Sequence, residues 1–176
     1  MSHAQQSDEI FDRVDEHDCV IGQAPRPEVH ARKWHHRAVH VFVWNGRGEL
    51  FLQFRSRLKV NHPQVWDSSC SGHVSAGQDY HEAAVRELGE ELGVPESKAR
   101  KIRPAFKIAT CAETEQEHVW LYEMEDEGPF TLQPEEVEDG RFFKPEDIDQ
   151  MISTTPEQFA PAFVHIWKLY RGQQKS

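Results

Sequence analysis

The sequence predicts a mixed α/β (α+β) protein in which a β-sheet packs between helices. Three observations predict this class. Runs of β-branched and aromatic residues flank a glycine-containing turn near the start, the spacing becomes helical after residue 79, and strand-like runs return before two helical segments at the end. With 176 residues, the chain has about the length of one domain. We therefore expect a flexible polar tail over residues 1–8 and a single domain over residues 9–176.

The first part of the chain favours two hairpins. Short strands are expected at 10–14 and 19–22, joined by a polar turn, and a short polar segment follows at 28–35. The clearest strand pair is 38–44 with 50–54, because Asn45-Gly46 favours a tight turn between two apolar runs.

A further strand is expected within residues 68–74, and a helix over residues 79–92 comes after it. Asp79 with Glu82 three residues later is typical of a capping box, and Gly93 supplies a C-terminal stop. The helix has one apolar side, which would face the core. Its members are Ala84, Val85, Leu88 and Leu92.

The second half of the chain is expected to return to strands and to end in helices. The expected strands are 105–109, 118–122 and 141–143, with a polar loop at 113–117 and an acidic loop at 134–140. Helices are expected at 145–152 and 156–170. Aromatic residues at helical spacing in the last helix indicate core or dimer contacts, so a homodimer is a hypothesis. The N-terminal hairpin and this helix would be additions at the edges of the domain.

Charge and composition exclude several classes of partner. The formal net charge is −10, which argues against binding a nucleic acid polymer or an anionic membrane. The sequence has no apolar run long enough to span a bilayer. It also has no basic segment followed by an apolar stretch at its start, so no secretory signal is predicted. Three widely spaced cysteines indicate a reducing compartment. We expect a cytoplasmic protein.

Three glutamates crowd onto one face of the predicted helix. Glu87, Glu90 and Glu91 are spaced i, i+3 and i+4, which brings their β-carbons to about 5–6 Å, and Gly89 between them costs helix stability. A divalent cation such as Mg²⁺ takes carboxylate and phosphate oxygens and would offset that repulsion. The alternative is an ordinary solvated acidic face.

The segment Gly72–Val94 closely resembles the signature of the Nudix hydrolases. Every fixed position matches except Gln78, where the family has a glutamate that supports the loop. The resemblance implies a Nudix fold, with a mixed sheet sandwiched between helices. It also implies a hydrolase that splits a diphosphate linkage by water attack at phosphorus.

By the same resemblance, Glu87, Glu90 and Glu91 would bind Mg²⁺ or Mn²⁺, and Arg86 would orient them. The general base stays open between Glu90, Glu91 and Glu136. The substrate would be a small nucleoside or organic diphosphate whose attached group the sequence does not name.

Residues before the signature are similar to type I isopentenyl diphosphate isomerases, which share the Nudix fold. The similarity covers Gln53–Lys59, Pro63, Val65-Trp66 and Gly72-His73. It implies that Arg55 and Lys59 hold the substrate diphosphate, and an arginine fork with a lysine suits that role on chemical grounds. It also implies metal-binding roles for His36 and His73, with His30 near a third such position. Structural roles for these histidines stay open.

The hydrolase is favoured over the isomerase because the Arg86-Glu87…Glu90-Glu91 set is complete and because of the residue before Gly72. The isomerases need a cysteine immediately before Gly72, where this sequence has Ser71, with Cys70 one position earlier. In an extended segment Cys70 would point away from the site, unless a one-residue bulge brought it in. A third class, a Nudix-like fold that only binds a ligand, is the weakest because none of the three glutamates is missing.

Overall fold

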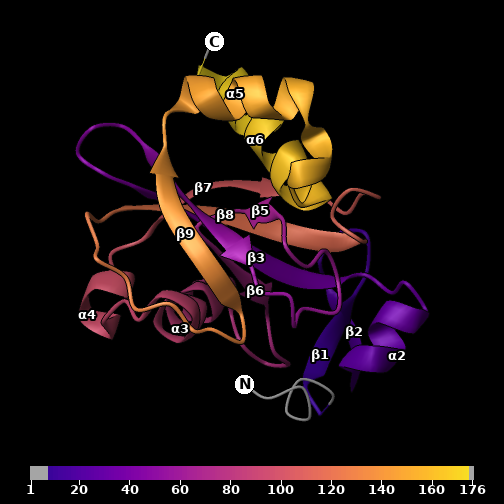
Figure 1. Ribbon diagram of the computed structural model, residues 1–176. Coiled ribbons are helices and arrows are strands. Elements are labelled where there is room, and N and C mark those ends of the chain that lie inside the picture. Colours follow the sequence, from indigo (N-terminus) through magenta and orange to yellow (C-terminus); the bar gives the residue numbers. More distant parts are fainter. Residues whose placement is uncertain (1–7, 175–176) are drawn as a thin grey trace.

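A seven-stranded mixed sheet lies between two layers of helices in the computed structural model, which describes residues 8–174 (Figure 1). Apart from Asp8, the predicted tail lies outside the described residues. The strands of the sheet are β3 (His36–Trp44), β4 (Leu50–Arg55), β5 (Trp66–Asp67), β6 (Cys70–His73), β7 (Arg103–Ile108), β8 (Glu117–Glu125) and β9 (Val137–Phe143). The helices that cover it are α3 (Tyr80–Leu92) and α4 (Glu96–Ala99) on one face, and α5 (Pro145–Thr154) and α6 (Pro161–Gln174) on the other. This arrangement confirms the predicted fold class.

The sheet is mixed because β3 runs parallel to β8, whereas the other pairs are antiparallel. Strands β3 and β4 form a hairpin, in which Trp44 pairs with Leu50. Further along, β6 pairs with β3, and β5 and β9 pair with β4. Short strands therefore bring the ends of β4 and β6 together with the start of β8.

Alternation along β3 divides the core into two layers. Val39, Val41 and Val43 pack toward α3, together with Leu88 and Leu92 of that helix. The side chains of Ala38 and Phe42 point to the opposite face and pack with residues of α5 and α6. The aromatic side of the last helix is thus core, as Phe163 and Trp167 are fully or almost fully buried.

The N-terminal hairpin is present as predicted and forms a separate two-stranded sheet of β1 (Ile10–Val14) and β2 (Val20–Pro25). It is followed by a short helix, α2 (Arg26–Ala31), which was not predicted from the sequence. Pro27 suits the first turn of a helix because its missing N–H has no partner there anyway. Fully buried Phe11 packs with Val29 of α2, and α2 carries His30 toward the main sheet.

Helix α3 has the predicted capping. The Asp79 side chain accepts a hydrogen bond from the Glu82 N–H at 2.8 Å. Gly93 ends the helix with a φ of 65°, a conformation that favours glycine.

Two predicted segments differ from the structure. The acidic loop expected at 134–140 becomes strand β9 from Val137, because β4 offers it a free edge, and Gly140 leaves room for the ring of Phe51. The helix expected at 156–170 is split into a 3₁₀ turn (Pro156–Gln158) and α6. Phe159 lies extended between them and bridges to Trp66, since Pro161 cannot continue a preceding helix. No helix among residues 8–174 is long and apolar enough to cross a membrane.

Candidate active site

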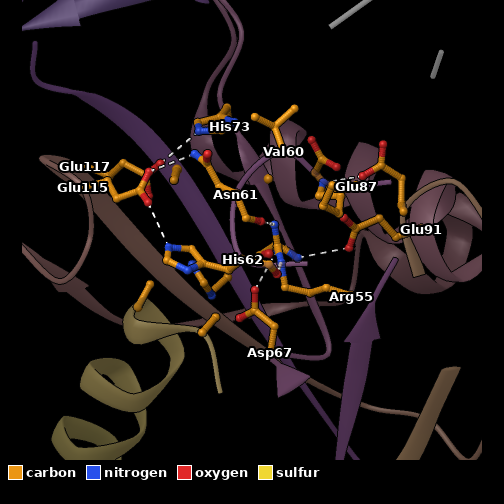
Figure 2. A pocket seen from close by; sticks show the side chains of 18 of the residues that line it. Arg55, Val60, Asn61, His62, Asp67, His73, Glu87, Glu91, Glu115 and Glu117 are labelled. Atoms are coloured by element: carbon orange, nitrogen blue, oxygen red, sulfur yellow. Dashed lines mark hydrogen bonds and ion pairs between the residues drawn. The ribbon is translucent and has the colours of Figure 1, made fainter. Parts of the chain in front are cut away.

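A cavity of about 520 Å³ opens between α3, the loop after β4 and the ends of β6 and β8. Most of the side chains that line it are charged or polar. The predicted site residues among them are Arg55, Lys59, His73, Arg86, Glu87, Glu90, Glu91 and Glu136. Figure 2 shows Glu87 and Glu91 on one side of the cavity, and His73 with Glu117 on the other. His36 is almost fully buried and lies behind the lining.

Two of the three α3 glutamates are buried. The exposed fraction is 9% for Glu87 and 4% for Glu91, whereas Glu90 is exposed. Burial raises the pKa of Glu87 and of Glu91 above the ordinary glutamate range, and the charges of neighbouring carboxylates raise both further. A pair of buried carboxylates is costly unless a cation shares the site.

Gly72 makes room for Glu87. A β-carbon built at Gly72 would lie 2.1 Å from Cδ of Glu87, a distance that no side chain tolerates. Glu91 is held from two strands, since its Oε2 accepts hydrogen bonds from Nε2 of Gln53 (3.0 Å) and from the N–H of Ser71 (3.2 Å). Both carboxylates are therefore fixed before any ligand arrives.

Arg86 connects the helix to the preceding loop. Its Nη1 lies 2.7 Å from Glu87 and 3.1 Å from Glu90, and its Nη2 donates to the backbone oxygen of His73 at 2.9 Å. The side-chain oxygen of Gln78 accepts from the Ser75 N–H at 3.3 Å and lies 3.5 Å from Arg86. An amide at this position therefore still closes the loop.

The two predicted diphosphate ligands have different surroundings. Arg55 donates to the backbone oxygens of Asn61 and His62 and to Asp67, at 2.9–3.0 Å, so it stabilises the loop that follows β4. Lys59, on that loop, forms an ion pair with Glu136 just before β9. The charge of Glu136 also raises the pKa of Glu91, which indicates how near these groups are.

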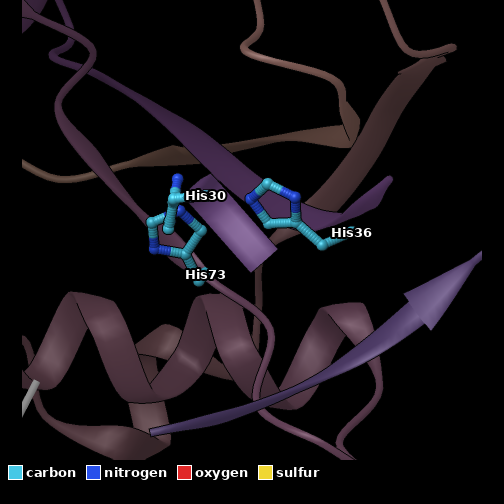
Figure 3. A group of neighbouring side chains, drawn as sticks. All are labelled: His30, His36 and His73. Carbon is cyan, nitrogen blue, oxygen red and sulfur yellow. The ribbon is translucent and has the colours of Figure 1, made fainter. Parts of the chain in front are cut away.

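Three histidines meet at the back of the cavity (Figure 3). One ligand atom each of His30, His36 and His73 lies within 4.8 Å of the other two. Nδ1 of His36 lies 2.9 Å from the backbone oxygen of Trp34. Because a carbonyl oxygen only accepts, Nδ1 is the donor of this bond and Nε2 is the ring atom that faces the cluster. Nε2 of His30 and Nε2 of His36 are buried without a hydrogen bond among the described residues.

Glu117 completes this cluster. Its Oε1 lies 2.9 Å from Nε2 of His73 and 3.4 Å from Nε2 of His36. Although burial opposes ionisation, the nearby ring nitrogens of these two histidines hold the pKa of Glu117 below its usual range. Burial lowers the pKa of His73 to about 3 and also lowers that of His30. Imidazole nitrogens beside a carboxylate form a donor set that suits a transition metal.

The structure separates Ser71 from Cys70. The register of β3 with β6 is regular, pairing His40 with Ser71 and Val41 with Cys70, so no bulge is present. Ser71 lines the cavity together with His40, while Cys70 is fully buried in the layer that contains Val41. Burial and then the charge of Glu91 raise the pKa of the Cys70 thiol well above its usual value.

The fold, the loop closed by Gln78 and the carboxylates of α3 together define a Nudix-type protein. A family model described as NUDIX domain matches residues 34–163. The chain belongs to the Nudix hydrolase family.

Relatives within this family carry two kinds of name. An uncharacterised Nudix hydrolase of Pseudomonas aeruginosa is 34% identical over 97% of this chain and 98% of its own length. An isopentenyl-diphosphate Delta-isomerase of Photorhabdus laumondii is 33% identical over 90% of both chains. A crystal structure of a Deinococcus radiodurans protein superposes with a TM-score of 0.82 at 28% identity, covering 91% of this chain and 98% of that one.

Sequence reasoning missed two residues that hold the site. Glu117 was placed in a polar loop, yet it begins β8 opposite His36. Gln53 was noted only as the first residue of the segment Gln53–Lys59 that is similar to the isomerases. In the structure it lies on β4 and donates a hydrogen bond to Glu91. Neither contact leaves a local signal, because each joins residues that are more than 35 positions apart.

Proposed function

We propose that the protein is a divalent-metal-dependent hydrolase that cleaves a diphosphate linkage in a small nucleoside or organic diphosphate by water attack at phosphorus. The observation that supports this most directly is the buried pair of Glu87 and Glu91 facing the cavity. Both carboxylates are anchored by neighbours, and both are destabilised by burial as long as no cation joins them.

The residues fit a hard cation. Glu87, Glu90 and Glu91 offer oxygen ligands, which Mg²⁺ and Mn²⁺ prefer. When bound, such an ion neutralises diphosphate oxygens and lowers the pKa of a coordinated water. Arg86 keeps Glu87 and Glu90 in place through its two ion pairs.

Lys59 is the better placed of the two proposed diphosphate ligands. Its ammonium needs only to exchange the carboxylate of Glu136 for a phosphate oxygen, whereas Arg55 is fully engaged in holding the loop. Arg55 would then contribute positive charge from the cavity wall. Glu136 lies close to Glu91, whose pKa its charge raises, and it is our preferred acceptor for a proton from the attacking water over Glu90 and Glu91.

The histidine cluster supports a second metal site. His30, His36 and His73 with Glu117 would hold a borderline ion such as Zn²⁺, and the buried nitrogens without hydrogen-bond partners among the described residues are the observation that favours it. The backbone bond of His36 already orients its ring for that role.

An isomerase is the second candidate function, and the histidine cluster together with the Photorhabdus relative favours it. Proton transfer across a C=C bond would need an acid–base group where Ser71 stands, and a hydroxyl is a poor one near neutral pH. Phosphorus and proton NMR separate the two functions when the protein is incubated with Mg²⁺ and a panel of candidate substrates. The panel contains nucleoside di- and triphosphates, ADP-ribose and isopentenyl diphosphate. New monophosphate or orthophosphate peaks support the hydrolase. A shifted alkene proton signal with an intact diphosphate supports the isomerase and contradicts our proposal.

A further inference from the structure

A second group of metal-ligating side chains lies on the rim of the cavity, apart from the carboxylates and histidines of the candidate active site. One ligand atom each of Cys111, Glu113 and His165 lies within 4.8 Å of the other two. The first two residues belong to the loop between β7 and β8, and His165 projects from α6. We propose that these three residues form a binding site for Zn²⁺ or a similar borderline divalent ion.

The donor set selects the kind of ion. A thiolate with an imidazole and one carboxylate is a set that Zn²⁺ prefers, whereas Mg²⁺ and Ca²⁺ avoid sulfur. The charges of the thiolate and carboxylate balance a dication, so the occupied site would be neutral. Three protein ligands leave a fourth tetrahedral position for water. The net charge of −10 attracts cations to the surface as a whole.

The distances require only a small contraction. Tetrahedral Zn²⁺ with bonds of about 2.0–2.3 Å holds its ligand atoms about 3.5 Å apart. Closing from within 4.8 Å therefore takes about 1 Å, which side-chain rotation supplies. Glu113 is exposed and Cys111 and His165 are half-buried, so an ion from solution can reach all three.

The loop presents its two ligands on a rigid frame. The Thr114 hydroxyl is buried and donates to the backbone oxygens of Cys111 (3.3 Å) and Glu117 (3.0 Å). The N–H of Gln116 donates to the same oxygen of Cys111 at 3.0 Å. Cys111 and Glu113 thus lie in a closed turn that is already ordered, so little conformational entropy would be lost when an ion binds.

Binding would connect the pocket rim to the C-terminal helix. The same loop supplies Thr114 and Glu115 to the cavity wall, and the residues at the start of α6 also line it. Glu115 contacts His62 at 3.1 Å across the mouth of the cavity. An ion at Cys111, Glu113 and His165 would therefore fix one side of the entrance. This proposal does not depend on which reaction the active site performs.

Cobalt titration of the purified full chain tests the site without any substrate. Co²⁺ bound to a thiolate gives a sulfur-to-metal charge-transfer band in the near ultraviolet, and ions held by carboxylates or histidines alone give none. We expect the band in the wild type, its loss in Cys111→Ser, and its retention in Cys19→Ser, which removes the exposed thiol. Added Zn²⁺ should displace Co²⁺ and abolish the band.

His165→Gln supplies a second variant that leaves the loop untouched. It should weaken Co²⁺ binding at the thiolate site at least about tenfold, with an unchanged circular dichroism spectrum. A wild-type protein without the band, a band that persists in Cys111→Ser, or equal affinity in His165→Gln would each overturn the proposal.

Discussion

Gly72 and Glu87 are packed so closely that the carboxylate of Glu87 occupies the space where a side chain of residue 72 would begin. Strand β6 and helix α3 meet at this contact, and the remaining groups of the carboxylate site are arranged around it. The glycine that starts the signature thus has a steric role, since it lets a buried carboxylate reach the cavity from the helix.

Gly72→Ala should therefore displace Glu87 and lower diphosphate hydrolysis by about two orders of magnitude or more. The matched control is Gly89→Ala, because the nearest atom to a β-carbon at Gly89 is the Val94 backbone oxygen at 3.8 Å. That variant should keep its activity and gain about 0.5–1 kcal/mol of stability from better helix propensity. Steady-state kinetics and thermal melts measure both. Full activity in Gly72→Ala would contradict the steric role.

Glu90→Gln and Glu91→Gln should each abolish metal-dependent turnover while the fold persists. In the metal-free protein, Glu91→Gln should melt no lower than the wild type, because it removes a buried charge and keeps an acceptor for Gln53. Glu96→Gln, on the exposed start of α4, is the control. Activity assays across a Mg²⁺ series and melting curves decide this, and full activity in both site variants would mean that the metal-site assignment is wrong.

Lys59→Met should raise KM about tenfold, with a smaller effect on kcat, because one charge-assisted hydrogen bond to the diphosphate is lost. Lys98→Met is the control, since Lys98, on α4, forms an ion pair with Asp126 after β8 and does not line the cavity. An unchanged KM in Lys59→Met would contradict the proposal that Lys59 exchanges the carboxylate of Glu136 for a phosphate oxygen.

Whether the sequence could predict a contact of this site depends on how far apart the two residues lie along the chain. The α3 glutamates and Arg86 could be placed because helical spacing is local. The partner of His36 could not, because Glu117 reaches it through a parallel pairing of β3 with β8 that no short pattern encodes. Likewise, the residues after Pro134 looked like a loop, since their strand forms only against the free edge of β4.

Asp18 connects the N-terminal hairpin to the main domain. Its carboxylate accepts from Nε of Arg37 at 2.6 Å and from the Tyr80 hydroxyl at 2.8 Å, and it pairs with Lys107. Burial alone would raise the pKa of Asp18, but these bonds lower it. Asp18→Asn should cost about 2–3 kcal/mol of unfolding free energy at neutral pH, and asparagine tolerates the φ of 65° at this position.

The pH dependence of that loss has a defined sign. Because the folded-state pKa is depressed, the contribution of Asp18 is complete above the ordinary aspartate pKa and disappears as the pH falls through the folded value. The wild type should therefore lose more stability than Asp18→Asn as the pH drops below about 4. Urea melts of both proteins across an acidic pH series measure this, and parallel curves would exclude an ionised Asp18 as the link.

The most direct test of the account uses ¹⁸O-labelled water with phosphorus NMR of the products. We predict that, with Mg²⁺ and a diphosphate that the protein turns over, one product phosphate carries the label. Glu91→Gln should give no labelled product. Unlabelled phosphate would place the attack at carbon, and an intact diphosphate with a moved double bond would identify an isomerase. Either result would contradict water attack at phosphorus.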